Sequence, residues 1–294
     1  MKERLAPSLF RYRTKAGVSN LAKNSRIEWT THTFNPWWGC VKVSPACKHC
    51  YAEAWAKRVG SRVWGIKAER RFFGDKHWSE PIKWDAVAAE AGERPRVFCA
   101  SMADVFEDRR DLDDARIRLW KLIEATPNLD WLLLTKRPEL VRKMVPWGQS
   151  WPANIWLGTT VEDQEWAEER LPHLAEIPAA VRFISAEPLL GSLNISRWLG
   201  EHIDWVITGG ESGPKARPSS PSWFLDLLNQ CMASEVPFHF KQWGDWAPGQ
   251  GLNLAKARAS HAADGTMMLR VGKKAAGRVL DGAIWDGLPK SRSA

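Results

Sequence analysis

Short runs of β-branched and aromatic residues alternate with amphipathic stretches from residue 96 onward. The stretches between the runs carry apolar residues at three- and four-residue spacing, which is typical of helices. This alternation predicts successive βα units and a parallel sheet. We expect strands at residues 96–100, 131–135, 155–158, 182–185, 205–208 and 238–241, an earlier strand at 28–33, and helices at 112–125, 138–145, 164–175 and 222–234.

The predicted fold class is α/β, a partial TIM-type βα barrel with six to seven parallel strands. The 294 residues are enough for one large domain with a single core. We expect a basic N-terminal extension at residues 1–26, the barrel at 27–244 and a C-terminal extension at 245–294 that packs on the barrel. Two regions give weaker signals. Residues 57–91 suggest a helix followed by an irregular excursion, and residues 245–294 suggest irregular structure with a short hairpin or helix near 272–278.

Polar residues recur where the predicted strands end. In a βα barrel the carboxyl ends of all strands share one rim, and active sites are built there. Helix capping explains an isolated Asp or Ser equally well, but the repetition after six strands favours a shared site. The segments concerned are Ser101–Asp104, Thr135–Pro138, Thr159–Glu162, Ser185–Pro188, Gly209–Gly213 and Lys241–Gly244.

The composition and net charge of the chain bear on its location and on the kind of partner it can bind. The chain has no apolar run close to the roughly 20 residues of a membrane helix, and its first residues lack the apolar core of a secretory signal, so we expect a cytoplasmic protein. The net charge of +8 allows a nucleic-acid partner. Solvated basic tails explain the charge as well, because much of the excess lies near the ends. Some of the nineteen tryptophans could stack on a nucleobase.

Three of the five cysteines lie within eleven residues, at Cys40, Cys47 and Cys50. The other two, Cys99 and Cys231, are isolated in apolar stretches. This distribution fits a reducing compartment and metal binding better than a disulfide framework. A closed structural zinc site takes four ligands, so three thiolates point to a site with one open position.

The identity of the metal stays open at this point, because thiolates accept both iron and zinc. A zinc site would need a fourth ligand, either a water or a histidine. His49 is adjacent to Cys50, so joint coordination by these two residues would be strained. His32 on the first predicted strand is therefore the better candidate.

The cysteine loop resembles that of radical S-adenosylmethionine (SAM) enzymes, in which three cysteines hold a [4Fe–4S] cluster and SAM binds the open iron. It is most similar to the spore photoproduct lyase group, whose Asn-Pro-x-x-Gly-Cys, Cys-x-x-Cys and Tyr-Ala elements correspond to residues 35–40, 47–50 and 51–52. The chain departs from the usual C-x3-C-x2-C spacing, with six residues in the first gap. Its Gly-Gly-Glu element follows the sixth predicted strand instead of the second.

Nearly the whole chain is also similar to a widespread family of phage and bacterial proteins with a three-cysteine motif. The similarity includes the cysteine loop and further phrases at residues 27–30, 134–139, 186–191, 209–213, 241–244 and 273–282. This second resemblance names no reaction.

The first resemblance implies reductive cleavage of SAM for hydrogen abstraction, with a nucleic acid or nucleotide-derived substrate. The alternative is a zinc-binding, nucleic-acid-associated phage-type protein without radical chemistry, and a protein partner stays open in both cases. Lys136 and Glu187 could instead pair with each other across the mouth, and Gly209-Gly210 could be a tight turn without a ligand. The expected metal ligands are Cys40, Cys47 and Cys50, the expected cofactor contacts are Ser101, Asp104, Thr159, Glu187, Gly209 and Gly210, and the expected catalytic residues are Lys136, Glu187, Glu211 and Lys241.

Overall fold

A computed structural model describes residues 25, 27–249 and 257–289 of the chain. The expected N-terminal extension at residues 1–26 lies outside the described residues, apart from Ser25. Within the described ranges, no helix has both the length and the apolar character needed to cross a membrane.

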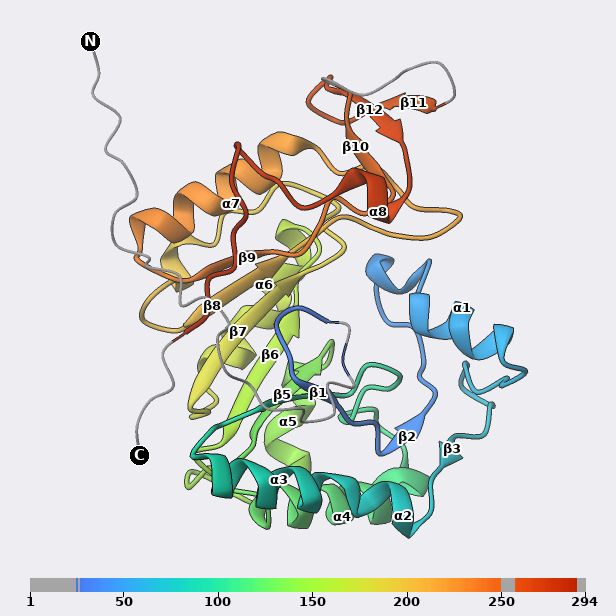
Figure 1. Cartoon of the computed structure of the whole chain (residues 1–294), viewed down its shortest axis with the longest axis vertical. Coiled ribbons are helices and arrows are strands. Elements are labelled where there is room, and N and C mark those ends of the chain that lie inside the picture. Colours follow the sequence, from blue (N-terminus) through green and yellow to red (C-terminus); the bar gives the residue numbers. More distant parts are fainter. Residues whose placement is uncertain (1–24, 26, 250–256, 290–294) are drawn as a thin grey trace.

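A seven-stranded parallel sheet forms the centre of the molecule and curls into a half-barrel (Figure 1). Its strands follow one another in the order of the chain, so each βα connection leads to the neighbouring strand. This confirms the predicted fold class. The strands are β1 (His32–Thr33), β4 (Arg96–Cys99), β5 (Asp130–Thr135), β6 (Ile155–Thr160), β7 (Val181–Ala186), β8 (Trp205–Thr208) and β9 (Phe238–Phe240).

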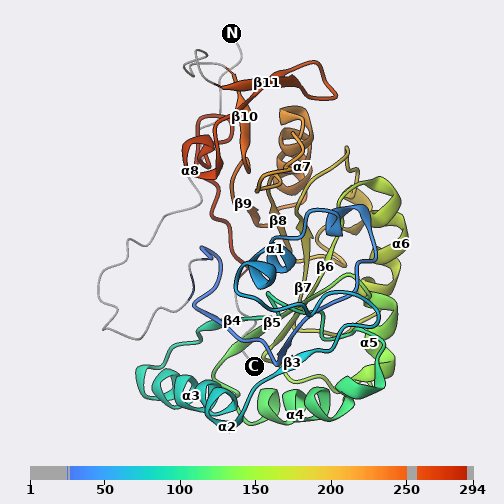
Figure 2. The same ribbon diagram turned by 90° about the vertical axis from the view of Figure 1, so that its right-hand side faces the viewer.

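Helices cover the outer face of the sheet (Figure 2). They begin where the sequence supplies start signals. The Asp163 side chain accepts a hydrogen bond from the Trp166 amide at 3.2 Å, and proline occupies the first turn of three other helices. The five helices of this layer are α3 (Glu80–Ala91), α4 (Asp113–Glu124), α5 (Pro138–Met144), α6 (Gln164–Ala175) and α7 (Pro221–Ala233). All of them except α3 match the predicted ranges.

Apart from α3, the two regions with weak sequence signals contain short elements. A two-stranded ribbon of β2 (Trp37–Trp38) and β3 (Arg71–Phe72) flanks the cysteine loop. A three-stranded antiparallel sheet lies in the C-terminal region. Its strands are short and partly exposed, so they carry little of the apolar alternation that reveals a strand. The remaining elements are the 3-10 turns η1 (Pro45–Cys47), η2 (Arg110–Leu112) and η3 (Ser196–Trp198), the helices α1 (Tyr51–Arg58), α2 (Asp75–Trp78) and α8 (Lys273–Ala276), and the strands β10 (Trp246–Pro248), β11 (Arg258–His261) and β12 (Met267–Arg270).

The sheet separates two apolar clusters. The larger one lies between the sheet and its helices. The smaller one fills the interior of the half-barrel near the amino ends of the strands and includes Trp29, Phe98, Phe183 and Trp205. Gly158 makes room for it, because a Cβ at this position would lie 2.4 Å from the Phe183 ring. This inner cluster closes the floor of the half-barrel and leaves polar side chains to its carboxyl end.

Candidate functional site

The cysteine loop begins at Gly39, where the backbone conformation and the close packing leave no room for a side chain. Gly39 has a φ of +119°, and a Cβ there would lie 2.3 Å from the Val63 carbonyl oxygen. The Gly39 amide donates a hydrogen bond to the Met102 carbonyl at 3.0 Å. The loop therefore leaves the β2 ribbon next to the segment that follows β4, at the carboxyl rim of the sheet.

All three loop cysteines are free thiols. Cys40 Sγ accepts a long contact of 3.9 Å from Arg137 Nη1, whereas Cys47 Sγ lies 3.9 Å from Ser44 Oγ. Burial raises the pKa of the Cys40 thiol to about 12; the Asp104 carboxylate adds to this rise and the Arg137 guanidinium opposes it. Burial also raises the pKa of Cys50, and the neighbouring Cys47 contributes to the rise. The thiols of Cys47 and Cys50 thus interact electrostatically, whereas the Cys40 thiol lies beside Arg137.

The three thiols do not form a closed ligand group. Across residues 25, 27–249 and 257–289, no cluster of three or more His, Cys, Asp or Glu side chains is placed to share one metal ion. His32, the expected outside candidate for a fourth ligand, lies on β1 and stacks on Trp84 of α3, with ring centroids 4.2 Å apart. It faces the helix layer, and no contact joins it to the cysteine loop.

A buried ion pair supports the first half of the loop. Asp104 is 6% exposed, and its two carboxylate oxygens accept four hydrogen bonds. Two of the donors belong to neighbouring polar groups of the rim, Thr135 Oγ1 at 2.8 Å and the Lys136 amide at 3.0 Å. A third is Arg137 Nη1 at 2.8 Å, and Arg137 Nη2 in turn donates to the Val41 carbonyl at 2.9 Å. Asp104 therefore fixes the guanidinium that holds the loop beside Cys40.

Glu162 holds the second half of the loop from the end of β6. Its side chain is fully buried, and Oε1 accepts a hydrogen bond from the Ala46 amide at 3.2 Å. Its other oxygen, Oε2, accepts from Arg170 Nη1 of α6 at 2.8 Å. The 3-10 turn that carries Cys47 is thereby tied to the sheet by a paired carboxylate.

The Glu211 carboxylate provides a third support. Arg217 Nε and Nη2 donate to its two oxygens at 2.8 and 2.6 Å. Arg217 Nη2 also donates to the Pro45 carbonyl at 3.1 Å. Glu211, which the sequence suggests as catalytic, is 5% exposed and pairs with this arginine, and its catalytic role stays a prediction. Three Arg–carboxylate pairs thus hold the cysteine loop against the rim.

Two polar groups face each other inside the mouth of the half-barrel. Lys136 donates from Nζ to Thr160 Oγ1 at 3.2 Å. Glu187 forms an ion pair with Lys241 Nζ, and its other oxygen accepts from Gln242 Nε2 at 3.1 Å. The open alternative of a Lys136–Glu187 pair is therefore wrong, because Glu187 takes its cation from the strand two places along the sheet.

A polar pair from the segments that follow β1 and β4 completes the mouth. Asn35 Nδ2 donates to Ser101 Oγ at 3.1 Å, and Asn35 Oδ1 accepts from the Met102 amide at 2.7 Å. Tyr51, the first residue of α1, donates from its hydroxyl to the Ser101 carbonyl at 3.0 Å. The expected contact Ser101 thus lies directly beside the cysteine loop.

The remaining expected cofactor contacts lie in other surroundings. Thr159 is fully buried and donates to the Thr135 carbonyl at 3.0 Å, on the helix-facing side of β6. Gly210 allows a close approach of two backbone segments, because a Cβ there would lie 1.9 Å from the Trp243 carbonyl oxygen. Gly209 lies nearer the mouth, where a Cβ would be 3.5 Å from Glu187 Oε1. Neither glycine needs a positive φ.

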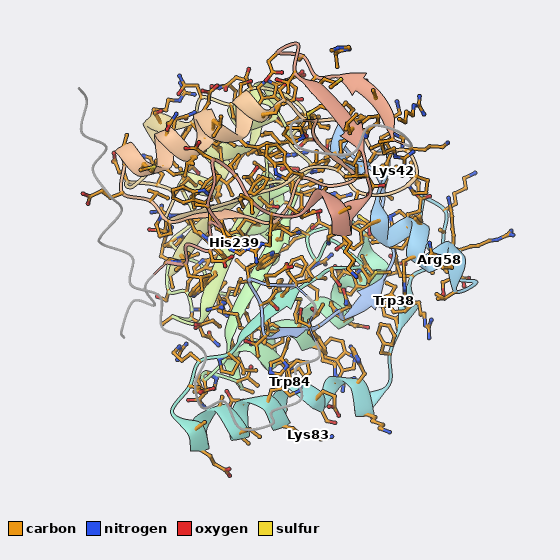
Figure 3. The ribbon with its side chains drawn as sticks, turned by 45° about the horizontal axis from the view of Figure 1, so that its top comes forward. Trp38, Lys42, Arg58, Lys83, Trp84 and His239 are labelled. Carbon is orange, nitrogen blue, oxygen red and sulfur yellow. The ribbon has the colours of Figure 1, made fainter. Side chains whose placement is uncertain are left out.

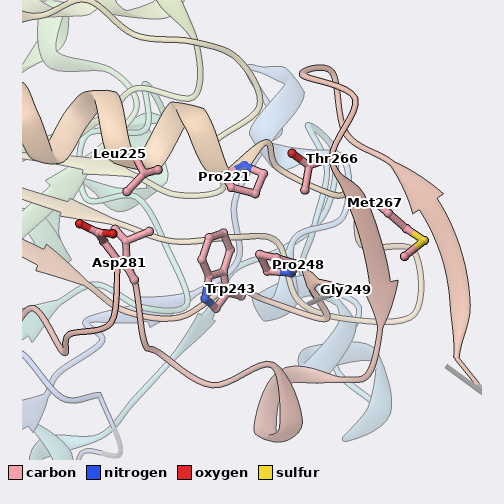
Figure 4. A pocket seen from close by; sticks show the side chains of 9 residues that line it. Pro221, Leu225, Trp243, Pro248, Gly249, Thr266, Met267 and Asp281 are labelled. Atoms are coloured by element: carbon pink, nitrogen blue, oxygen red, sulfur yellow. The ribbon is translucent and has the colours of Figure 1, made fainter. Parts of the chain in front are cut away.

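A cavity of about 640 Å³ lies away from this mouth (Figure 4). It opens between α7 and the small C-terminal sheet, and its walls are mainly apolar, with Leu225, Trp243 and Met267 among them. None of the expected ligands or catalytic residues lines it. This cavity is therefore separate from the residues that the sequence suggests for metal binding and catalysis.

Comparison with known proteins gives a family for the chain. Residues 24–289 match the family described as "Protein of unknown function (DUF5131)". The chain belongs to this family. No curated protein matches it. The relation to phage proteins with a three-cysteine motif stays a prediction.

Solved structures of spore photoproduct lyase show a distant likeness. A mutant with bound AdoMet and dinucleoside spore photoproduct has 13% sequence identity and a TM-score of 0.44, over 82% of this chain and 68% of that chain. A second mutant has 13% identity and a TM-score of 0.45, over 90% and 81%.

Proposed function

We propose that this chain is a radical SAM-like enzyme that binds a [4Fe–4S] cluster through Cys40, Cys47 and Cys50. The observation that carries the proposal is the placement of three free thiols on one loop, which three Arg–carboxylate pairs hold at a polar barrel mouth. A loop that served only as a connection would not need so many buried charged supports, since each costs desolvation.

The donor set fits such a cluster by its chemistry. Iron–sulfur clusters are held by cysteine thiolates, and these three are uncrosslinked and close in sequence. As placed, the Cys40 sulfur faces Arg137 and not its two partners. The same guanidinium that neutralises Asp104 is then available to a thiolate at Cys40, which is the ionised form that metals bind.

Such a cluster, when bound, supplies the electron for reductive cleavage of SAM. The protein itself contributes orientation and the exclusion of water. Lys136 and Thr160 offer a cation and a hydroxyl on one wall, and the Glu187–Lys241 pair offers both signs of charge on the other. Asn35 and Ser101 lie between this interior and the cysteine loop. We propose that these groups bind the polar parts of SAM and of its substrate.

The apolar floor of the mouth also supports the binding of SAM and a substrate there. The cluster of Trp29, Phe98, Phe183 and Trp205 fills the half-barrel below the polar groups. A ligand in the mouth therefore rests on apolar side chains, and its polar groups meet the charges of the rim in a setting with little bulk water. Electrostatic interactions are stronger under such conditions.

The test is the metal content of protein purified without oxygen. We expect brown protein that absorbs near 400 nm and carries about four iron atoms per chain, and that converts SAM to 5′-deoxyadenosine after reduction. Cys47→Ala should lose the iron and the turnover. Cys231→Ala is the matched control, because Cys231 lies in α7 within the outer core. Colourless wild-type protein with one zinc per chain would overturn the proposal, as would full iron content in Cys47→Ala.

A further inference from the structure

We propose that the surface formed by α1 and the β2–β3 ribbon binds single-stranded nucleic acid. We call it the α1 face. Its defining residues are Trp38, Tyr51, Trp55, Arg58 and Arg71.

The α1 face exposes aromatic rings that a folded chain would ordinarily bury. Tyr51 is 61% exposed and Trp55 42%. Trp55 and Trp38 meet edge to face with their ring centroids 4.9 Å apart, and the Arg71 guanidinium lies 4.6 Å above the Trp38 ring. The result is a row of rings and a guanidinium plane at the surface. Nucleobases stack on such groups without regard to sequence, because every base has a π-face.

Positive charge surrounds these rings. Residues 42–76 contain nine Lys or Arg and only three Asp or Glu, and of these cations Arg70 is buried in a pair with Glu107. One of the acids, Glu53 of α1, is already paired with Lys42 and Lys57 at 2.7 and 2.6 Å. Trp38, Lys42 and Arg58 lie around α1 (Figure 3), and Arg58 is exposed. Such cations can take up backbone phosphates and release their counterions.

The combination favours a single strand over a duplex. The bases of a duplex are stacked inside it and cannot reach the side chains of a protein surface, so exposed rings would gain nothing from duplex binding. An unpaired strand can place its bases on Trp55 and Tyr51 and its phosphates near Arg58. Basic groups alone would serve either form equally.

The α1 face also leads to the mouth of the half-barrel. Helix α1 begins directly after Cys50, and the Tyr51 hydroxyl reaches the Ser101 carbonyl at 3.0 Å. A strand that lies along α1 would bring one nucleotide toward the Lys136 and Glu187 groups. This delivery rests on the proposed function, whereas binding to the α1 face does not.

The test measures fluorescence anisotropy with a labelled 20-nucleotide single strand, as DNA and as RNA, and with the matching DNA duplex. The full chain is purified anaerobically and used without SAM. We expect Trp55→Ala to weaken single-strand binding roughly five- to a hundredfold, the range measured for loss of one stacked base. Arg58→Ala should lower the slope of log K against log salt by about 0.7, as for one lost phosphate contact.

A matched arginine–tryptophan pair elsewhere on the molecule provides the control. Arg197 lies 5.0 Å from the Trp198 ring, in a 3-10 turn far along the chain. Arg71→Ala should weaken binding several-fold, and Arg197→Ala should leave the dissociation constant unchanged. The thermal midpoint of unfolding of each variant shows whether it is folded. If Trp55→Ala does not fold, the salt dependence of binding by Arg58→Ala tests the proposal instead, because Arg58 is exposed.

Equal loss of affinity in Arg71→Ala and Arg197→Ala would overturn the proposal. Tighter binding of the duplex than of the single strand would also overturn it. Protein that holds zinc instead of iron but shows the expected binding pattern would refute only the radical chemistry, so the two proposals can fail separately.

Discussion

Replacing Glu162 by alanine removes a buried carboxylate that joins α6 to the cysteine loop. The Glu162 side chain is fully buried, and that of its partner Arg170 is only 2% exposed. The substitution leaves the Arg170 guanidinium in the core without its counter-charge and the Ala46 amide without its acceptor. The guanidinium would then be a buried charge without a carboxylate, and the amide would be a buried donor without an acceptor.

The magnitude follows from these contacts. Breaking a buried ion pair by removal of one partner costs about 3–5 kcal/mol. Arg170 keeps its hydrogen bond to the Thr160 carbonyl at 2.8 Å and its position 4.1 Å from the Trp166 ring, which favours the lower end of that range. The lost acceptor for the Ala46 amide adds to the cost. We expect the free energy of unfolding to fall by about 3–5 kcal/mol.

Urea unfolding under reducing, anaerobic conditions measures this change, and the rate of thiol labelling reports on the loop around Cys47. We expect faster labelling in Glu162→Ala. The control is Glu168→Ala on α6, the helix that carries Arg170, and its partner Arg197 also lies over a tryptophan. Because Glu168 is 47% exposed and Arg197 62%, this exposed pair should be worth less than about 1 kcal/mol. A similar loss of stability in both variants would refute the reasoning.

Two further predictions concern the sheet. Gly210→Ala should destabilise the protein by roughly 1–3 kcal/mol, because the new Cβ would press on the Trp243 carbonyl, whereas Gly74→Ala has no neighbour within 4 Å and should change the melting temperature little. Burial lowers the pKa of His239 to about 4, so its contribution is full above about pH 6.5 and is lost as the pH falls from there toward 4. Unfolding at pH 7 and pH 5 should differ by roughly 2 kcal/mol from this group, and His239→Phe should remove that difference.

The strands and most of the outer helices could be predicted because their signals are local. Each central strand, such as Ile155–Thr160, is an apolar run buried on both faces, and each of these helices shows its own periodicity. The polar residues at the strand ends could also be placed on one rim, because parallel strands end on the same side. Helix α3 could not be predicted from apolar periodicity, because it follows directly on α2 and only two of its residues are buried.

The partners within the site could not be predicted. The Ala46–Glu162 contact joins residues 116 positions apart, and the Pro45–Arg217 contact spans 172. Sequence spacing carries no information on such pairs, so the pairing of Glu211 with Arg217 could not be predicted, and the catalytic role of Glu211 stays a prediction. The signal that could have pointed to Glu162 was its place in one of the recurring strand-end segments.

The amino-acid sequence by itself determined the βα order, the shared rim and the group of three thiols, because periodicity and spacing are properties of neighbouring residues. Only the tertiary structure decided where the thiols face, which cation each carboxylate takes and which aromatic rings stay at the surface. These depend on how the sheet curls, since the curl brings the ends of β6, β7 and β9 and the cysteine loop to one mouth.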